Sequence, residues 1–190
     1  KSREENPSAE VSYESGGLTY LASYAKILRK TLGTNLLWLD AGDEWQGSLE
    51  SNLWQGAPMI AGFNAASLDA AAIGNHEFDY GAANDPAPQA SGAVSTKPDL
   101  LGALKNRLQE AKYPFLSANI FDKSTGKQPE WPNFFPSRLF KVGRLSVGVI
   151  GLTTLETPKT TLSDNIQTLE FRALREATLH ETQKLREAGA

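Results

Sequence analysis

Apolar residues recur at helical spacing near the start of the chain and form short unbroken runs after that. Residues 18–32 are predicted to be a helix because one apolar stripe runs along them, formed by Leu18, Leu21, Ala25, Leu28 and Leu32. Gly33 follows and predicts the end of this helix. Residues 36–39 read Leu-Leu-Trp-Leu, a run that is typical of a parallel strand buried on both faces.

Helix and strand signals continue to alternate along the rest of the chain. The predicted elements are, in chain order, helix 57–66, strand 69–73, a helix from near Thr96 with Pro98 in its first turn, strand 113–120, a hairpin of 138–142 and 145–152, and helix 170–188. Residues 81–97 are predicted to form a long loop, and residues 122–137 an excursion with several turns. The last helix carries an inner apolar face interrupted by Glu181, with His180 on its opposite, exposed face.

This alternation predicts an α/β fold with a mostly parallel sheet and helices on both faces. Residues 1–14 are polar and lack periodicity, so they are predicted to be an arm or the remnant of a loop. In parallel sheets of this kind, ligands bind beyond the carboxyl ends of the strands. The residues that follow 36–39 and 69–73 are therefore expected to lie close together.

Composition narrows the class of protein. The chain has 190 residues, of which 40% are hydrophobic and 22% charged, as in a soluble globular protein with a core. Its net charge of −3 and lack of a basic block argue against a nucleic acid polymer as partner. No apolar run reaches the ~18 residues that a membrane span needs. There is no cysteine, so any metal must be held by oxygen and imidazole donors, and only His76 and His180 supply imidazole.

Metal-binding and acid–base residue types follow both of the first two predicted strands. Asp40 and Asp43 come after residues 36–39, and Asn75, His76 and Asp79 come after residues 69–73. Carboxylate and amide oxygens bind divalent cations, and an imidazole beside a bound phosphate can act as a general acid. Together these residues predict metal-dependent hydrolysis of a phosphate ester.

Two of these residues have alternative interpretations. A carboxylate at Asp43 can bridge two cations about 3.5–4 Å apart, but Asp after a strand is also a common helix N-cap. Asn75 offers a carbonyl oxygen to a divalent ion, but after Gly74 it can also be a left-handed residue or a turn residue. Asp40 is interpreted as a supporting or structural carboxylate.

His76 is predicted to be catalytic rather than structural, because Asp79 follows at turn spacing. Asp79 can accept a hydrogen bond from one ring nitrogen, fix the tautomer and raise the basicity of the imidazole. Glu77 and Tyr80 are predicted to support the turn, and Phe78 to be a buried anchor for it. His180 is predicted to have no part in the chemistry.

Several segments resemble the 5′-nucleotidase branch of the calcineurin-like metallophosphoesterases. The resemblance runs from about residue 15 to the end of the chain, and the segments that carry it are Asp40-Ala41-Gly42-Asp43 with Gln46-Gly47, the Gly-Asn-His-Glu-Phe-Asp-Tyr-Gly motif at 74–81, and residues 16–18, 116–119 and 147–154. The motif at 74–81 is the most specific of these.

The resemblance implies a layered, αββα-like fold and a role for each site residue. Asp43 would bridge two divalent metal ions (Zn, Mn, Mg, Ca or Fe), and Asn75 would bind the second. His76 would stabilise the transition state with Asp79 as its dyad partner. The substrate would be a nucleoside phosphate attacked by metal-activated water, in a periplasmic, cell-surface or secreted protein.

The chain also departs from the family pattern. The family has a first strand ending in Asp-x-His, and later a further His and a Gly-His-x-His element; two histidines cannot supply these. Residues 15–190 are therefore expected to be part of a catalytic domain. We expect the other strands and a C-terminal substrate domain to come from elsewhere in a longer or nicked protein, in the same or a separate chain. The strand that leads to Asp43 is then expected to have an open edge and an apolar flank.

Two alternatives remain open from the sequence. The fold can serve as a catalytically silent binding or structural module, which the missing ligands favour. A metallophosphoesterase of this kind can also act on another substrate, such as a cyclic nucleotide or a sulfur-oxidation intermediate.

Overall fold

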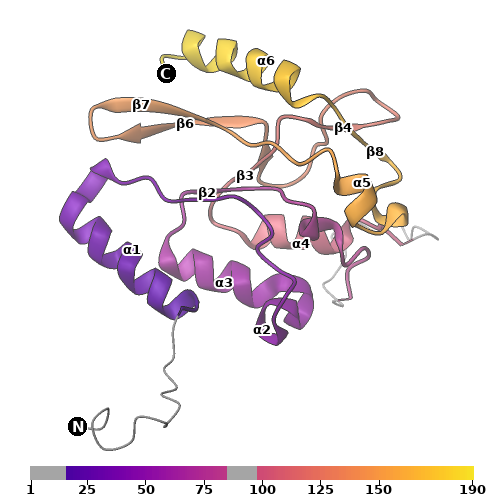
Figure 1. The fold of residues 1–190 in the computed structure, drawn as a ribbon, viewed down its shortest axis with the longest axis horizontal. Coiled ribbons are helices and arrows are strands. Elements are labelled where there is room, and N and C mark those ends of the chain that lie inside the picture. The colour runs from indigo at the N-terminus through magenta and orange to yellow at the C-terminus, as the bar shows by residue number, and fades with distance from the viewer. Residues whose placement is uncertain (1–15, 85–97) are drawn as a thin grey trace, which may run out of the picture.

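The computed structural model describes residues 16–84 and 98–190, which form layers of helices and strands (Figure 1). A parallel four-stranded sheet has the order β1 (Leu39–Asp40), β2 (Ala70–Ala72), β3 (Phe115–Leu116) and β5 (Phe134–Phe135). Two antiparallel pairs accompany it: the hairpin of β6 (Ser137–Val142) with β7 (Leu145–Ile150), and β4 (Ile120–Asp122) with β8 (Leu169–Phe171).

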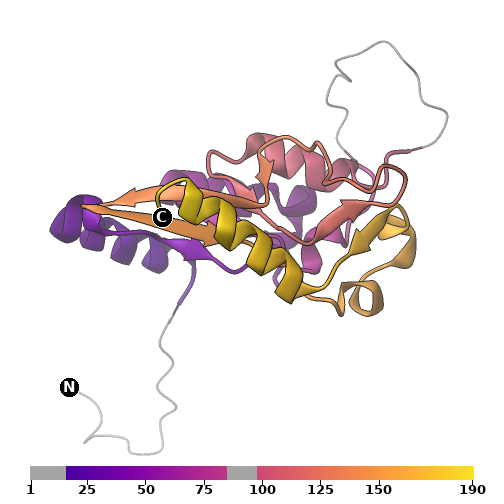
Figure 2. The same cartoon turned by 90° about the horizontal axis from the view of Figure 1, so that it is seen from above.

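The helices lie on two sides of these strands. Figure 1 shows α1 (Leu18–Leu32), α3 (Ala57–Ala66) and α4 (Gly102–Glu110) on one side of the parallel sheet. On the other side lies the β6–β7 hairpin, with α6 (Leu174–Glu187) packed across it (Figure 2). Short segments complete the described chain: α2 (Leu49–Asn52), α5 (Thr157–Thr160), and the 3-10 turns η1 (Gly33–Asn35), η2 (Leu53–Gly56), η3 (His76–Phe78) and η4 (Ser163–Ile166). The predicted layered α/β fold is confirmed.

Several predicted elements are confirmed, and others need correction at their ends. The helices at 18–32 and 57–66, the strand within 69–73 and the 138–152 hairpin form as expected. Thr96 and residues 85–97 of the predicted loop lie outside the described residues. The helix expected near Pro98 begins at Gly102, because Asp99 holds a turn: its Oδ1 accepts from Leu101 N–H at 3.0 Å and its carbonyl from Gly102 N–H at 2.9 Å.

Three strands differ from the prediction. The strand predicted at 113–120 is two strands, β3 and β4. After Ser117, which still donates to Phe135 of β5, the backbone N–H of Ala118 turns to the carbonyl of Gly151 outside the parallel sheet. The excursion at 122–137 contains β5, which pairs with β3 and extends the sheet. The last helix begins at Leu174 rather than 170, because Leu169–Phe171 pair with β4 as β8.

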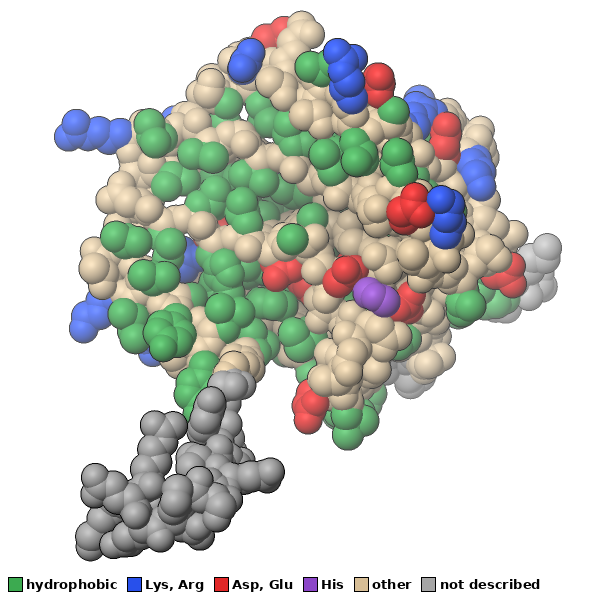
Figure 3. Space-filling model, viewed as in Figure 1, with side chains coloured by type: hydrophobic (Ala, Val, Ile, Leu, Met, Phe, Trp, Pro, Cys, Tyr) green, Lys and Arg blue, Asp and Glu red, His purple; other side chains and the backbone are tan. Residues whose placement is uncertain are grey.

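The strand β1 lies at an exposed edge of the sheet. Of the strand predicted at 36–39, only Leu39 pairs in the sheet, and its side chain is 44% exposed. The prediction that this strand is buried on both faces is therefore wrong. Among the described strands β1 contacts only β2. Of the stripe on α1, Ala25 is buried, whereas Leu21, Leu28 and Leu32 are exposed. Figure 3 shows apolar side chains gathered in a hollow between α1 and the hairpin, as expected for an open edge with an apolar flank.

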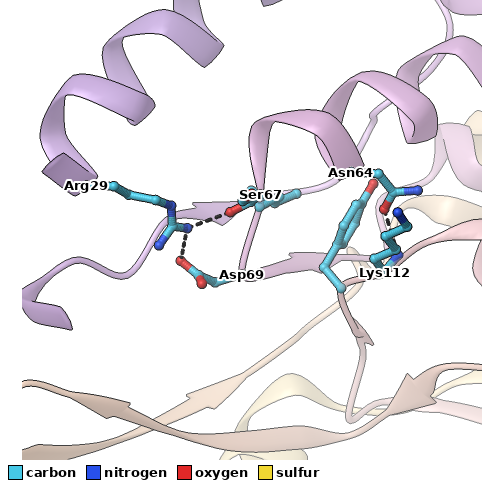
Figure 4. Close-up of a pocket in the computed structure, with 7 residues that line it drawn as sticks. Arg29, Asn64, Ser67, Asp69 and Lys112 are labelled. Atoms are coloured by element: carbon cyan, nitrogen blue, oxygen red, sulfur yellow. Dashed lines mark hydrogen bonds and ion pairs between the residues drawn. The ribbon is translucent and has the colours of Figure 1, made fainter. Parts of the chain in front are cut away.

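A charged pair joins α1 to the start of β2. Arg29 Nη2 donates to Asp69 Oδ2 at 2.7 Å and to the carbonyl of Ser67 at 2.5 Å, and Asp69 Oδ2 also accepts from Trp38 N–H at 2.7 Å. This pair lines a cavity of about 320 Å³ (Figure 4). Asp69 precedes β2 whereas Asn75 follows it, so the cavity lies at the opposite end of the sheet from the predicted site.

The core lies between the parallel sheet and the helices α3 and α4. Its fully buried members come from both layers and include Ile60, Ile73, Phe78, Leu104, Leu108, Tyr113 and Phe115. Across residues 16–84 and 98–190, no helix combines the length and apolar character that crossing a membrane requires.

Candidate active site

The two predicted site segments meet at the carboxyl end of the parallel sheet. β1 and β2 pair in parallel, so the chain leaves both strands at the same edge. There a Cβ on Gly42 would lie 2.5 Å from the backbone nitrogen of Gly74, and a Cβ on Gly74 would lie 2.2 Å from Asp43 Oδ1. Glycine at both positions therefore lets the two segments come into contact.

Glu77 joins the same two segments through its carboxylate. Oε2 accepts from the backbone N–H groups of Gly74 at 2.6 Å and Asp43 at 2.9 Å, and Oε1 accepts from Glu44 N–H at 2.7 Å. Burial raises the pKa of Glu77 to about 7. The three backbone hydrogen bonds act in the opposite direction and make this rise smaller. The prediction that Glu77 supports the turn is confirmed, and its contacts extend to the other segment.

Asp43 lies against the 74–81 motif and does not cap a helix. Its φ of 58° is left-handed, and its Oδ1 accepts from the backbone N–H of His76 at 3.1 Å. The N-cap of the following helix α2 is Ser48, whose side chain accepts from Ser51 N–H. The alternative interpretation of Asp43 as an N-cap is therefore wrong.

Asn75 is a turn residue, but not a left-handed one. Its φ of −82° and ψ of −29° are right-handed, and it stands at the N-cap position of η3 without a side-chain cap bond. Among residues 16–84 and 98–190 its side-chain amide has no hydrogen-bond partner. Its amide oxygen therefore remains available to a ligand, and its two chain neighbours, Gly74 and His76, both lie against Asp43.

His76 and Asp79 form the predicted pair. Nδ1 of His76 lies 2.6 Å from Asp79 Oδ2, and the two side chains are 38% and 16% exposed. The pKa of His76 is raised, first by this hydrogen bond, while partial burial lowers it less. An ionised carboxylate only accepts hydrogen bonds, so Nδ1 carries the proton and Nε2 is left for chemistry.

Three further side chains bind Asp79, two at its carboxylate and one at its backbone carbonyl, and sequence reasoning found none of these contacts. Thr161 Oγ1 donates to Asp79 Oδ1 at 3.0 Å, and Gln46 Nε2 donates to Asp79 Oδ2 at 3.3 Å. Asn165 Nδ2 donates to the carbonyls of Phe78 at 2.8 Å and Asp79 at 3.2 Å. Gln46 lies in a segment that carries the family resemblance, but residues 161–165 lie beyond all of those segments.

A buried polar network supports the other end of the motif. Thr153 Oγ1 donates to the carbonyl of Ile73 at 2.6 Å, and Asn119 Oδ1 accepts from Thr153 N–H at 2.8 Å. Ser117 Oγ lies 2.9 Å from Thr153 Oγ1, and these three polar side chains are fully buried. Residues 116–119 and 147–154, which carry part of the resemblance, thus position the end of β2.

Acidic groups behind Asp43 are mostly structural. Asp40 Oδ1 accepts from Gly42 N–H at 2.9 Å, which agrees with a structural carboxylate, and burial raises its pKa. Burial also raises the pKa of Glu44 to about 9, although the hydrogen bond from Tyr113 at 2.6 Å lowers it.

The residues present fit part of a divalent-cation site. Asp43 and Asn75 offer the hard oxygen donors that such ions prefer. In the described part of the chain, however, no group of three or more His, Cys, Asp or Glu side chains could hold an ion. Two donors at one edge fit a shared site whose other ligands lie outside the described residues.

Phe78 and His180 lie as expected, whereas Tyr80 makes its side-chain hydrogen bond outside the turn. Phe78 is 2% exposed and packs edge-on against Phe171 with ring centroids 5.9 Å apart. Tyr80 donates its hydroxyl to Asn52 at 2.9 Å. The His180 side chain is 73% exposed on α6, where Nδ1 lies 3.1 Å from the buried Glu181.

No family model matches the chain, but individual proteins do. It is 36% identical to the snake venom 5′-nucleotidase of Naja atra over 157 residues, which cover 83% of this chain and 26% of that protein. It is 38% identical to Protein UshA of Escherichia coli over 140 residues, which cover 74% of this chain and 21% of UshA.

Solved structures agree with these matches. The 5′-nucleotidase precursor from Thermus thermophilus superposes with a TM-score of 0.70 and 28% identity, over 92% of this chain and 30% of that one. The chain spans about a quarter of the length of the two curated relatives that it matches. The chain belongs to the 5′-nucleotidase family and has the fold of a calcineurin-like phosphoesterase.

Proposed function

We propose that this chain is part of a metal-dependent phosphoesterase that hydrolyses nucleoside 5′-phosphates. The observation that carries the proposal is the 2.6 Å contact between His76 Nδ1 and Asp79 Oδ2, next to Asp43 and Asn75 at the carboxyl edge of the sheet. Two divalent ions, when bound by Asp43 and Asn75 with ligands from elsewhere, supply the Lewis acid and the activated water.

The chain's own residues then act on the phosphate ester. The partly exposed imidazolium of His76 donates from Nε2 to a phosphate oxygen or to the departing ester oxygen, and offsets the negative charge that develops there. Asp79 holds the ring in the required tautomer and stabilises its positive charge. Glu77 keeps the two segments together while the substrate binds.

The rest of the catalytic domain and a substrate domain are proposed as partners. This is supported by the quarter length that the chain spans in its curated relatives and by the two-donor site. It is also supported by the exposed β1 edge and by exposed apolar side chains of α1, among them Tyr24 and Ile27, which are 67% and 60% exposed. We place the parent protein in the periplasm, at the cell surface or outside the cell, because a snake venom protein is among its relatives.

Chelation should abolish the activity. The full-length protein is expected to release phosphate from nucleoside 5′-monophosphates, and to lose this activity after treatment with a chelator and regain it with Mn²⁺ or Zn²⁺.

Asp43→Asn should weaken metal binding and activity together, because an amide cannot bridge two ions as a carboxylate does. Phosphate release and metal content are measured side by side, with Asp164→Asn, an exposed change, as the control.

A catalytically silent module is the second candidate, favoured by the two-donor site. It predicts a metal-replete full-length protein that releases no phosphate from any nucleotide. Activity on cyclic nucleotides but not on 5′-monophosphates would instead change the substrate and leave the chemistry in place.

A further inference from the structure

Residues 153–165 contact both ends of the 74–81 motif. Thr153 binds the carbonyl of Ile73 just before the motif, and Asn165 binds the carbonyls of Phe78 and Asp79 within it. Gly81 also passes so close to Asn165 that a Cβ there would lie 2.6 Å from its Oδ1. The backbone of the motif is therefore fixed by this segment without help from Thr161.

Thr161 makes a different kind of contact. Its side chain reaches the carboxylate of Asp79 and no backbone atom of the motif: Oγ1 donates to Oδ1 at 3.0 Å. The other carboxylate oxygen, Oδ2, faces His76 Nδ1 at 2.6 Å. A carboxylate bound at Oδ1 cannot rotate about its χ2 bond without breaking that hydrogen bond, so Oδ2 stays directed at the imidazole.

We propose that Thr161 is a positioning residue for the His76–Asp79 pair. Its hydroxyl fixes the plane of the Asp79 carboxylate, which in turn fixes the orientation and tautomer of the imidazole. Gln46, whose amide lies 3.3 Å from Oδ2, makes a longer and more exposed contact. The expected effect of Thr161 on the rate rests on the proposed function. The hydrogen bond from Thr161 to Asp79 does not, because it can be observed without catalysis.

The rate experiment compares substitutions at two neighbouring threonines in the full-length protein. Thr161→Val removes the hydroxyl and is expected to lower kcat for nucleotide hydrolysis roughly 10-fold, with little change in KM. Thr161→Ala should behave like Thr161→Val, and Thr161→Ser should restore most of the rate. Thr160→Val is the matched control, because the exposed Thr160 hydroxyl binds only backbone carbonyls of its own turn. In a His76→Ala background, Thr161→Val should have no further effect.

A spectroscopic experiment tests the same contact without activity. With ¹⁵N-labelled histidine, the His76 Nδ1–H proton is expected to give a far-downfield signal in the wild type, Thr160→Val and Thr161→Ser. In Thr161→Val and Thr161→Ala this signal should broaden or move, because the carboxylate is free to rotate.

The outcomes distinguish the positioning role of Thr161 from the proposed function. An unchanged Nδ1–H signal in Thr161→Val, or an equal loss of rate in the His76→Ala background, would overturn the positioning role. If the full-length protein releases no phosphate, the proposed function fails, and if His76→Ala leaves hydrolysis unchanged, the catalytic role of His76 fails. In either case the Nδ1–H signal alone decides the role of Thr161.

Discussion

Replacing His76 with alanine is expected to lower nucleotide hydrolysis by the full-length protein roughly 100- to 10,000-fold. General acid catalysis by a positioned side chain contributes about that much to a rate. His76 has the geometry for it: Nδ1 is bound by Asp79 at 2.6 Å, and its side chain is 38% exposed, so Nε2 can reach a bound phosphate. The loss should fall on kcat, measured as phosphate release at saturating substrate.

The chain contains its own control for this change. His180→Ala removes the second of the two histidines, a side chain that is 73% exposed on α6, and should leave the rate unchanged. Metal content should also be unchanged in His76→Ala, because His76 is not proposed as a ligand. Equal rates for the two variants would remove His76 from the mechanism.

Replacing Glu77 with glutamine should disrupt both the fold near the site and its activity. The two carboxylate oxygens accept three backbone N–H groups, and Glu77 is 2% exposed. An amide has one oxygen, so its NH₂ must face at least one N–H donor. We expect the free energy of unfolding to fall by about 3 kcal/mol, since a buried hydrogen bond is lost and a buried N–H donor is left unpaired.

The same change should release Asp43 from the 74–81 motif. Glu77→Gln is therefore expected to lower metal content and activity at temperatures where the protein is still folded. Denaturant unfolding and metal analysis measure the two effects, with the exposed Glu50→Gln as the matched control. A Glu77→Gln protein with wild-type stability would contradict the role given to this carboxylate.

Local pattern predicted the elements whose residues share one clear period. The stripe on α1 and the two strand-like runs of the β6–β7 hairpin each extend over five or more residues, and both elements form where predicted. β5 and β8 have two and three residues, too few to show a period, and they exist because β3 and β4 offer partners. The exposure of Leu39 was also unpredictable locally, because it depends on which strands lie beside β1.

In the site, too, local sequence patterns predicted some residues, whereas contacts between distant segments could not be predicted. Asp43, Asn75, His76 and Asp79 could be named because chemically telling residues follow two predicted strands. The three donors to Glu77 come from two segments, and Thr161 lies 82 residues from Asp79. Such contacts depend on how the loops fold together, which cannot be predicted from the spacing of residues along the chain.

Anomalous X-ray scattering from crystals of the full-length, metal-replete protein tests the central claim, that this chain holds one part of a two-metal site. We predict two peaks about 3.5–4 Å apart, both within ligand distance of Asp43 and one within ligand distance of Asn75. Further ligands should come from residues outside the described chain. The absence of any peak at Asp43 and Asn75 in active protein would contradict the account.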